Sequence, residues 1–223
     1  ERMGAVFVEE LSAVPPGART VFSAHGVPPQ AHAEAGQRGL RVVDATCPLV
    51  TKVHIEARRF AQARRTVFLI GHAEHVEVIG TRGEAPEHIV VVGSVAEAER
   101  ASAPDPQAVA YLTQTTLSLD DTREILAVLK RRFPALVGPG KADICYATQN
   151  RQNAVQALVQ ATDAILVVGS ANSSNSNRLV EVARSRGRPA YLLNSHEELR
   201  PGWLKGVRRI GVPAGASAPE ALV

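Results

Sequence analysis

The stretch that decides the fold runs from residue 41 to residue 60 and reads RVVDATCPLVTKVHIEARRF. Its first residues, Arg41–Asp44, are rich in valine and predict a short strand. Helical spacing of apolar residues begins just after Cys47 and predicts a helix over Pro48–Arg64. A strand therefore leads through a cysteine into an amphipathic helix, whose buried stripe consists of Val50, Val53, Ala57 and Phe60.

The same alternation of strand and helix recurs along the chain and predicts an α/β fold with parallel sheets. The other expected strands are Ala5–Glu9, Thr20–Ser23, Thr66–Ile70, Ile89–Val92, Ala108–Leu112, Ala164–Val168, Ala190–Leu193 and Arg209–Val212. The other expected helices are Leu119–Arg132, Thr148–Ala161 and Asn177–Arg186.

Composition excludes several classes of protein. Of 223 residues, 45% are hydrophobic and 21% are charged, as in globular proteins, and no apolar run approaches the roughly 20 residues of a membrane span. The first residues do not resemble a signal peptide, so we expect a cytoplasmic protein without membrane association. A net charge of +3 without an aromatic platform argues against nucleic-acid binding, and two cysteines are too few for a disulfide scaffold.

Both cysteines follow an aspartate and precede an expected helix. The first lies in Val42-Val-Asp-Ala-Thr-Cys47-Pro48 and the second in Asp143-Ile-Cys145-Tyr146. At a helix N-terminus, the helix dipole and the free backbone N–H groups favour an anion and lower the pKa of a thiol. Since thiolates bind metals, the pair suggests a metal centre.

Polar side chains gather just after the expected strands. Ligands bind beyond the carboxyl ends of strands in open α/β sheets, so these residues are candidates for a site. Hydroxyls, amides and imidazoles suit an anion that is held by neutral donors beside proton-transfer groups. Helix capping and structural histidines are the alternative interpretations. The candidates are His25, His72, His75, Glu77, Gln114, Thr115, Ser173, Ser174, Asn175 and Ser217.

The segment from His72 to Glu77 holds two histidines and two glutamates within six residues. Closely spaced histidine and glutamate can bind zinc. They can also form a proton relay, because a glutamate in a closed pocket has a raised pKa and a neighbouring histidine can pass protons to it. The residues alone leave both interpretations open.

Seven motifs follow one another along essentially the whole chain. They are Ser23-Ala-His-Gly-Val27, Asp44-Ala-Thr-Cys-Pro-Leu-Val-Thr-Lys-Val-His54, Gly71-His-x-x-His-x-Glu77, Thr113-Gln-Thr-Thr-Leu-Ser118, Asp143-Ile-Cys-Tyr-Ala-Thr148, Gly169-Ser-x-Asn-Ser-Ser-Asn-Ser-Asn-Arg-Leu179 and Ala214-Gly-Ala-Ser-Ala-Pro219. In order and spacing these motifs resemble those of the IspH/LytB family of 4-hydroxy-3-methylbut-2-enyl diphosphate reductases, which act in the methylerythritol phosphate pathway of isoprenoid biosynthesis.

The resemblance implies three similar α/β units around a pseudo-threefold axis, with a [4Fe-4S] cluster in a central cavity. The corresponding boundaries are 1–46 for an incomplete first unit, 47–143 for the second and 144–223 for the third. Cys47 and Cys145 would be two of three cysteine ligands, leaving one iron free to take the substrate hydroxyl. Single electrons would come from ferredoxin or flavodoxin.

The resemblance also assigns roles to the polar residues. Glu77 would deliver a proton to the allylic diphosphate substrate, with Thr115 and His75 completing its hydrogen-bond network, and the products would be isopentenyl and dimethylallyl diphosphate. Substrate binding would fall to His25, His75, Thr115, Gln114, Ser173, Ser174, Asn175 and Ser217.

The chain departs from the family pattern in places. The first cluster cysteine, in a Gly-Phe-Cys-Ala-Gly-type segment, is missing, so we expect an N-terminally truncated member that binds a cluster poorly. Val76 stands where the family usually has proline, and Pro213 where it usually has threonine. The competing hypotheses are a zinc-dependent hydrolase using His72, His75 and Glu77, and a non-catalytic diphosphate-binding remnant.

Overall fold

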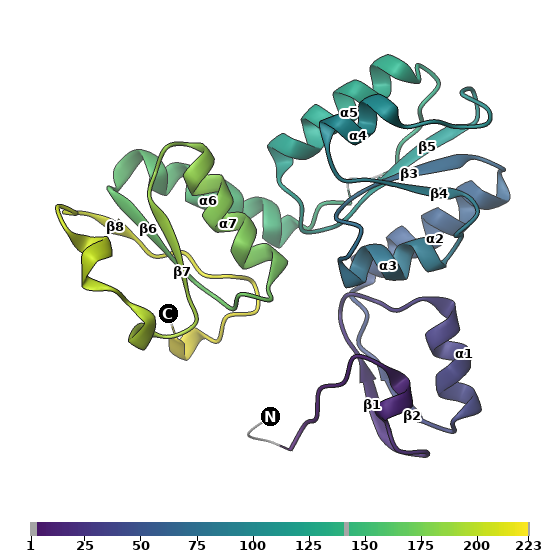
Figure 1. Ribbon diagram of the computed structural model, residues 1–223, viewed down its shortest axis with the longest axis horizontal. Helices are drawn as coiled ribbons and strands as arrows, with labels where there is room; N and C mark the ends of the chain where they lie inside the picture. Colours follow the sequence, from purple (N-terminus) through teal and green to yellow (C-terminus); the bar gives the residue numbers. More distant parts are fainter. Residues whose placement is uncertain (1–3, 141–142, 223) are drawn as a thin grey trace. The chain divides into compact units, whose positions relative to one another are not determined.

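The computed structural model describes residues 4–140 and 143–222, which form two compact units. Unit 1 comprises Glu1–Gln114 and Glu124–Asp143, and unit 2 comprises Thr115–Arg123 and Ile144–Val223. The strands form three parallel sheets, in the orders β1-β2, β4-β3-β5 and β7-β6-β8 (Figure 1). The predicted α/β class is confirmed. No helix within the described ranges is long and apolar enough to cross a membrane.

Unit 1 contains β1 (Arg19–Phe22), α1 (Pro29–Gln37), β2 (Arg41–Asp44), α2 (Pro48–Gln62), β3 (Thr66–Ile70), α3 (Val76–Gly83), β4 (Ile89–Val92), α4 (Val95–Arg100) and β5 (Val109–Thr113). α5 (Leu119–Arg132) begins in unit 2 and ends in unit 1. Unit 2 continues with α6 (Tyr146–Ala161), β6 (Ala164–Val168), α7 (Ser174–Ser185), β7 (Ala190–Leu193) and β8 (Ile210–Gly211). Short 3-10 helices span Leu11–Ala13, His196–Glu198, Pro201–Leu204 and Glu220–Leu222.

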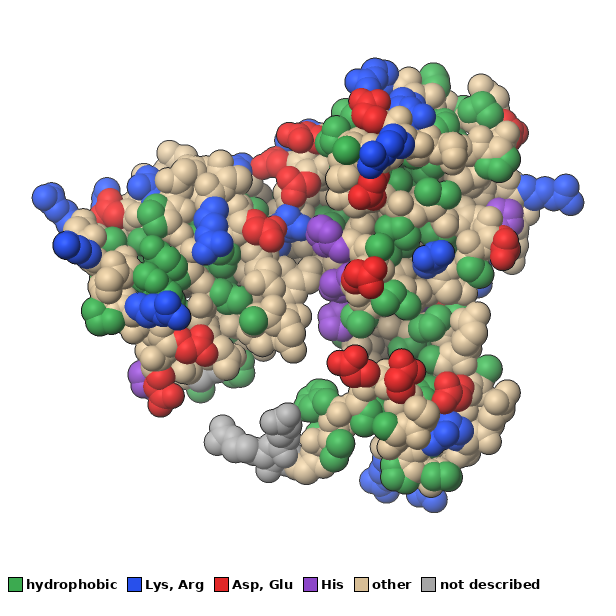
Figure 2. All heavy atoms as spheres, viewed as in Figure 1, with side chains coloured by type: hydrophobic (Ala, Val, Ile, Leu, Met, Phe, Trp, Pro, Cys, Tyr) green, Lys and Arg blue, Asp and Glu red, His purple; other side chains and the backbone are tan. Residues whose placement is uncertain are grey.

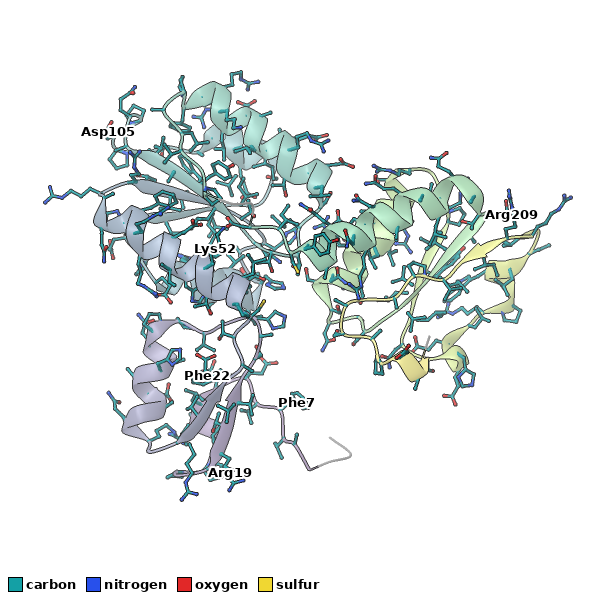
Figure 3. The ribbon with its side chains drawn as sticks, turned by 180° about the vertical axis from the view of Figure 1, so that it is seen from behind. Phe7, Arg19, Phe22, Lys52, Asp105 and Arg209 are labelled. Atoms are coloured by element: carbon teal, nitrogen blue, oxygen red, sulfur yellow. The ribbon has the colours of Figure 1, made fainter. Side chains whose placement is uncertain are left out.

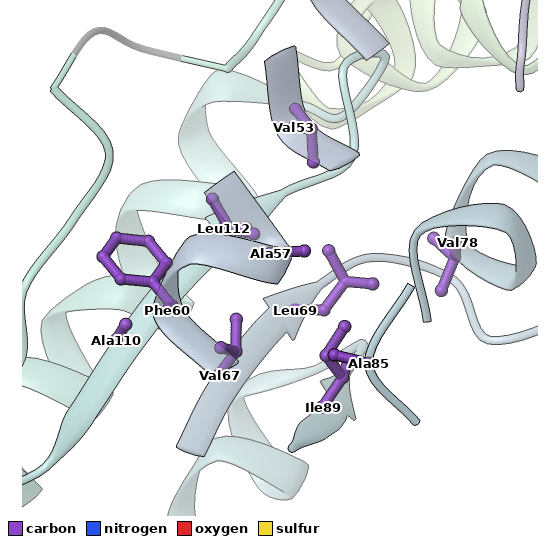
Figure 4. Close-up of a cluster of buried hydrophobic side chains, with 10 residues drawn as sticks. All are labelled: Val53, Ala57, Phe60, Val67, Leu69, Val78, Ala85, Ile89, Ala110 and Leu112. Atoms are coloured by element: carbon purple, nitrogen blue, oxygen red, sulfur yellow. The ribbon is translucent and has the colours of Figure 1, made fainter. Parts of the chain in front are cut away.

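The main core of unit 1 surrounds β3, the central strand of its sheet. Figure 1 shows α2 and α3 on one face of this sheet and α4 and α5 on the other. A strand covered on both faces needs a continuous apolar run, which the sequence TVFLI supplies. The buried cluster between the sheet and α2, shown in Figure 4, consists of Val53, Ala57, Phe60, Val67, Leu69, Val78, Ala85, Ile89, Ala110 and Leu112.

The first sheet of unit 1 has two strands and is less well covered. Val21 of β1 lies opposite Val43 of β2, and their exposed fractions are 67% and 60%. Phe22 is buried and meets the His32 ring edge to face at 5.0 Å. Since an isolated pair of strands is marginally stable, this sheet depends on the contacts of its other face.

The core of unit 2 repeats the arrangement on a smaller scale. All five residues of β6 are buried, and this strand lies between β7 and β8. Its cluster consists of Val155, Val159, Ile165, Val167, Leu179, Val180, Val182, Ala183 and Ala190, from α6, α7 and two strands.

Several elements differ from the sequence predictions. The strand expected at Ala5–Glu9 is wrong: the segment forms no strand, and Val6 and Phe7 are 84% and 80% exposed. The helix expected to reach Arg64 ends at Gln62, because Arg64 adopts a left-handed conformation with φ 54°. The helices α1, α3 and α4 were not predicted, and α3 begins inside the segment interpreted as a loop site.

Replacing Leu69 by alanine should lower the free energy of unfolding by about 2–5 kcal/mol, because it leaves a cavity in the central strand of the larger core of unit 1. Val90→Ala in β4 is the matched control. Its side chain is 37% exposed, and its loss should cost about 1 kcal/mol or less. Urea denaturation of both variants provides the measurement, and equal losses would contradict this description of the core.

Candidate functional site

The two cysteines occupy equivalent backbone positions. Cys47 is the N-cap of α2 with φ −57° and ψ 133°, and Cys145 is the N-cap of α6 with φ −59° and ψ 132°. Both thiols are free and partly exposed, and neither side chain caps its own helix. Each cysteine therefore stands at a helix N-terminus, where the first backbone N–H groups have no partner within the helix. This donor set fits iron–sulfur ligation, in which cysteine thiolates hold the irons.

In unit 1, the structure brings His25 and His75 together. Their rings meet edge to face with centroids 5.6 Å apart, and His25 Nδ1 lies 3.2 Å from the hydroxyl of Ser23. Figure 2 shows histidine side chains gathered on one side of unit 1. Burial lowers the pKa of His25 below its usual value. Both predicted histidines thus present largely neutral imidazoles, which can donate or accept hydrogen bonds.

His75 is the N-cap of α3, and its Nδ1 accepts a hydrogen bond of 3.2 Å from the backbone N–H of Glu77. Burial, together with smaller contributions from the neighbouring His25 and His72, lowers the pKa of His75 to about 4. An Nδ1 that accepts carries no proton, so the neutral ring carries its proton on Nε2. The helix cap and the burial together hold this tautomer.

Glu77 lies in the first turn of α3 and is 2% exposed. Its side chain therefore belongs to the interior of unit 1. Gln114 is also buried, and its Oε1 accepts from the N–H of His72 at 3.1 Å. Gln114 thus fastens the loop that precedes the His75 cap. In the structure, Gln114 supports the loop after β3 that contains His72 and His75, which we call the histidine loop.

Sequence reasoning missed His54, a buried residue of α2. Gly26 has φ +75°, and a Cβ added there would lie 3.0 Å from the His54 ring. A Cβ on Gly80 of α3 would lie 3.3 Å from the Gly26 carbonyl oxygen. The His25 turn is therefore held between α2 and α3. The signal in the sequence was Gly26, which directly follows the candidate residue His25 and indicates a close approach of another side chain to the backbone.

His54 is held in turn by Glu84, whose carboxylate lies 2.9 Å from His54 Nδ1 and also pairs with Arg58. Desolvation lowers the pKa of His54, and it outweighs the opposing effect of Glu84. The His54 ring is therefore a buried packing group that lies against the turn containing Gly26.

In unit 2, hydroxyl groups converge on the N-terminus of α7. Ser173 is the N-cap, and its Oγ accepts from the Ser176 N–H at 3.3 Å. The hydroxyls of Ser174 and Thr116 lie 3.0 Å apart. The backbone N–H of Cys145 donates to the Thr115 carbonyl at 3.0 Å. The Cys145, Thr115 and Ser173 segments, separate in sequence, are therefore neighbours in unit 2.

Asn175 stands out within this group. The residue is 6% exposed, and among the described residues neither its Nδ2 nor its Oδ1 has a hydrogen-bond partner. Leaving a buried amide unsatisfied costs about 1–3 kcal/mol per group. Such a group in a native structure calls for an additional partner. A bound ligand with both acceptors and donors would satisfy it.

Ser217 lies in an exposed turn that is fixed close to α7. The preceding Gly215 donates its N–H to the Val168 carbonyl at 2.8 Å. Gly215 also packs directly on Ser176, as does Gly169 at the end of β6. Neither glycine has room for a Cβ beside the Ser176 hydroxyl, which donates to Ser173 Oγ at 3.0 Å. Sequence reasoning did not select Ser176, although it lies within the serine and asparagine run.

Two features bear on other interpretations. Among residues 4–140 and 143–222, no three His, Cys, Asp or Glu side chains are grouped closely enough to hold a metal ion, so the zinc-hydrolase hypothesis gains no support. A groove of about 590 Å³ in unit 2 is lined partly by Tyr191 and Trp203, whose rings stack at 4.3 Å. It includes none of the predicted site residues.

The sequence matches the family described as "LytB protein" over residues 1–223. The chain belongs to the LytB family. The resemblance inferred from the seven motifs is therefore confirmed.

Relatives of this LytB-family chain carry one activity in their names. This chain is 56% identical over 220 residues to the 4-hydroxy-3-methylbut-2-enyl diphosphate reductase of Aromatoleum aromaticum, and the match covers 99% of this chain and 70% of the relative. It is 55% identical over 224 residues to the enzyme of that name from Mycolicibacterium paratuberculosis, covering 100% and 68%. The structure of the E-1-hydroxy-2-methyl-but-2-enyl-4-diphosphate reductase from Plasmodium falciparum matches with TM-score 0.94 and 41% identity, covering 99% and 70%.

The low pKa of His75 predicts acid sensitivity. Because the unfolded chain takes up a proton near pH 6.5 that the folded ring resists until about pH 4, the free energy of unfolding should fall as the pH is lowered through this window. His75→Asn keeps an N-cap acceptor but cannot titrate. Urea denaturation at about pH 7 and about pH 5 should show a smaller loss for this variant. An equal loss in both proteins would contradict the assignment.

The packing around Ser176 predicts a specific rescue. Gly215→Ala should lower the free energy of unfolding by about 1–3 kcal/mol, because the new methyl group meets the Ser176 hydroxyl. Ser176→Ala should restore most of that loss, since the next atom, Ser176 Cβ, lies 3.4 Å away.

Gly169→Ala is the matched control for this rescue. Its methyl group would still meet Ser176 Cβ at 2.7 Å, so Ser176→Ala should not restore the stability that Gly169→Ala loses. Thermal melts of the singles and doubles provide the measurement. Rescue of both glycine variants, or of neither, would show that the Ser176 hydroxyl does not set this packing.

Proposed function

We propose that this chain supplies two cluster cysteines and most of the substrate site of a reductase that converts 4-hydroxy-3-methylbut-2-enyl diphosphate into isopentenyl and dimethylallyl diphosphate. The observation that carries the proposal is the matched geometry of Cys47 and Cys145, each the N-cap of a helix in a LytB-family chain. A [4Fe-4S] cluster, when bound, supplies electrons and an open iron for the substrate hydroxyl. The reaction belongs to the methylerythritol phosphate pathway.

The proposed assembly has three similar α/β units around a pseudo-threefold axis and a central cavity, with boundaries at 1–46, 47–143 and 144–223. Its support is the repeated parallel sheet, which has two strands in the first case and three in the others. In each of the last two sheets the central strand is buried and candidate residues follow its carboxyl end. Open α/β sheets bind ligands beyond the carboxyl ends of their strands.

The diphosphate is proposed to bind at the N-terminus of α7. Free N–H groups and the helix dipole favour phosphate at such a position. Ser173, Ser174 and Ser217 would offer hydroxyl donors, and the diphosphate oxygens would accept a hydrogen bond from the buried Nδ2 of Asn175. His25 and His75 of unit 1 would add neutral imidazole donors. Gln114 is proposed to line the same cavity.

The proton is proposed to come from Glu77, whose burial protects it from water. His75 and Thr115 would complete its hydrogen-bond network. Because His75 Nδ1 is occupied by the helix cap, its contribution is a donated hydrogen bond from Nε2. Ferredoxin or flavodoxin is the proposed electron donor, and the cytoplasm is the proposed location.

Three thiolates would hold the cluster, and the 223 residues contain two cysteines. The third ligand is therefore proposed to come from a Gly-Phe-Cys-Ala-Gly-type segment outside these residues. Two thiolates hold a cluster less firmly than three, so the chain by itself should be impaired.

Anaerobic iron and sulfide analysis, together with a visible spectrum and reduction of the substrate, tests this proposal. The chain alone should bind little cluster and show little turnover, and addition of the cysteine-bearing segment should restore both the brown colour and turnover. Cys47→Ser and Cys145→Ser in the extended protein should each lose them again, whereas His196→Ala, in a 3-10 helix outside the site, should not.

Other results would identify the competing functions. A colourless, zinc-loaded protein with hydrolase activity would replace the reductase. Diphosphate binding by calorimetry, without iron even in the extended protein, would indicate a non-catalytic remnant. A full four-iron cluster with normal turnover in the chain alone would refute the need for a third cysteine.

A further inference from the structure

The Ser173 hydroxyl, at the N-terminus of α7 in unit 2, accepts two hydrogen bonds from a single residue. Ser176 donates to Ser173 Oγ with its backbone N–H at 3.3 Å and with its own hydroxyl at 3.0 Å. A serine hydroxyl has two acceptor lone pairs and one hydrogen. Both lone pairs of Ser173 are therefore occupied, and its hydrogen is left to point away from Ser176.

Two glycines that pack on the Ser176 oxygen set the direction of its hydroxyl. A Cβ added to Gly169 or to Gly215 would run into Ser176 Oγ. In each glycine a Cα–H bond takes the place of that Cβ and points at the oxygen, as in weak C–H···O contacts. These contacts fill the acceptor side of the Ser176 hydroxyl, so its hydrogen goes to Ser173.

The two glycines follow neighbouring strands of one sheet. Gly169 comes directly after β6, and Gly215 comes after β8, which begins just past Arg209, labelled in Figure 3. β6 and β8 pair in parallel, and the Gly215 N–H donates to the last carbonyl of β6 at 2.8 Å. Ser176 is 1% exposed, whereas Ser173 is partly exposed. The buried hydroxyl is thus anchored to the sheet, and the hydroxyl that it orients can reach a ligand.

The occupied lone pairs restrict what Ser173 can bind. A free serine hydroxyl can donate to a ligand or accept from it. With both lone pairs filled, Ser173 can only donate, which suits an anion. Hydroxyls linked in one direction also polarise one another and strengthen the last donor. Such a preset donor binds an anion without first having to turn toward it.

We propose that Ser176 is a positioning residue, which commits the Ser173 hydroxyl to donation and directs it at an anionic oxygen of the diphosphate. The inference rests on the proposed function, because it refines how the N-terminus of α7 binds that group. Ser176 acts through Ser173 and is itself too deeply buried to meet the ligand.

Titration calorimetry of the 223-residue chain with inorganic pyrophosphate tests the role in binding. Ser176→Ala should weaken binding by roughly 3- to 10-fold, because a hydrogen bond to a charged group is lost in part. Ser173→Ala should weaken binding at least as much. The double variant should bind no more weakly than Ser173→Ala alone, since Ser176 acts only through Ser173. Ser185→Ala removes a hydroxyl from the last turn of α7 and should bind like the wild type.

Neutron diffraction of the deuterated wild-type chain tests the orientation without a variant or a ligand. The Ser176 deuterium should lie between the two hydroxyl oxygens, and the Ser173 deuterium should point away from Ser176. The reverse arrangement would overturn the proposal, even if Ser176→Ala proves too unstable to titrate. Unchanged binding in a folded Ser176→Ala chain, further weakening in the double variant, or no pyrophosphate binding by the wild type would overturn it as well.

The outcome is separable from that of the proposed function. An extended protein that binds iron and reduces substrate, but whose pyrophosphate affinity ignores Ser176, contradicts only the positioning role. A chain in which Ser176 and Ser173 act together on pyrophosphate, but whose extended form never binds iron, contradicts only the reductase.

Discussion

The first N–H groups of an α-helix have no partners within the helix, and the candidate site is built around that requirement. Cys47 begins α2, His75 begins α3, Cys145 begins α6 and Ser173 begins α7. Two of these residues cap their helices with side chains, while the two cysteines leave the N–H groups open. One local geometry thus anchors a polar side chain in two cases and leaves the cysteine side chain uncommitted to the cap in the other two.

The sheets explain why these helix starts are near strand ends. Apart from Thr66 at the start of β3, the central strands β3 and β6 consist of buried apolar residues, and polar residues follow where each strand ends. The histidine loop follows β3, and the serine and asparagine run follows β6. Tight glycine contacts then fix the loops, with Gly26 against His54 in unit 1 and Gly215 against Ser176 in unit 2.

Local pattern predicted the central strands and the helix start after Cys47, because apolar runs and helix starts are properties of neighbouring residues. It placed Cys145 only near a helix, which was expected from Thr148 and begins at Tyr146. It missed α3, whose sequence VEVIGTRG is rich in β-branched residues and glycine and is stabilised by the His75 cap and by packing. It placed a strand at Ala5–Glu9, where the composition suits a strand but no partner strand lies beside it in the described structure. The hydrogen bond from Lys52 to Asp143 spans 91 positions, and no local pattern reveals such a contact.

The capping role of His75 restricts how its ring can handle protons. A histidine that shuttles must release a proton from one nitrogen and reload at the other, and its tautomer exchanges in the process. Here that exchange would put a hydrogen between Nδ1 and the Glu77 amide and would remove the first cap of α3. The imidazole therefore acts as a hydrogen-bond donor of fixed direction, and net proton transfer through it would cost α3 its N-cap hydrogen bond, about 0.5–2 kcal/mol.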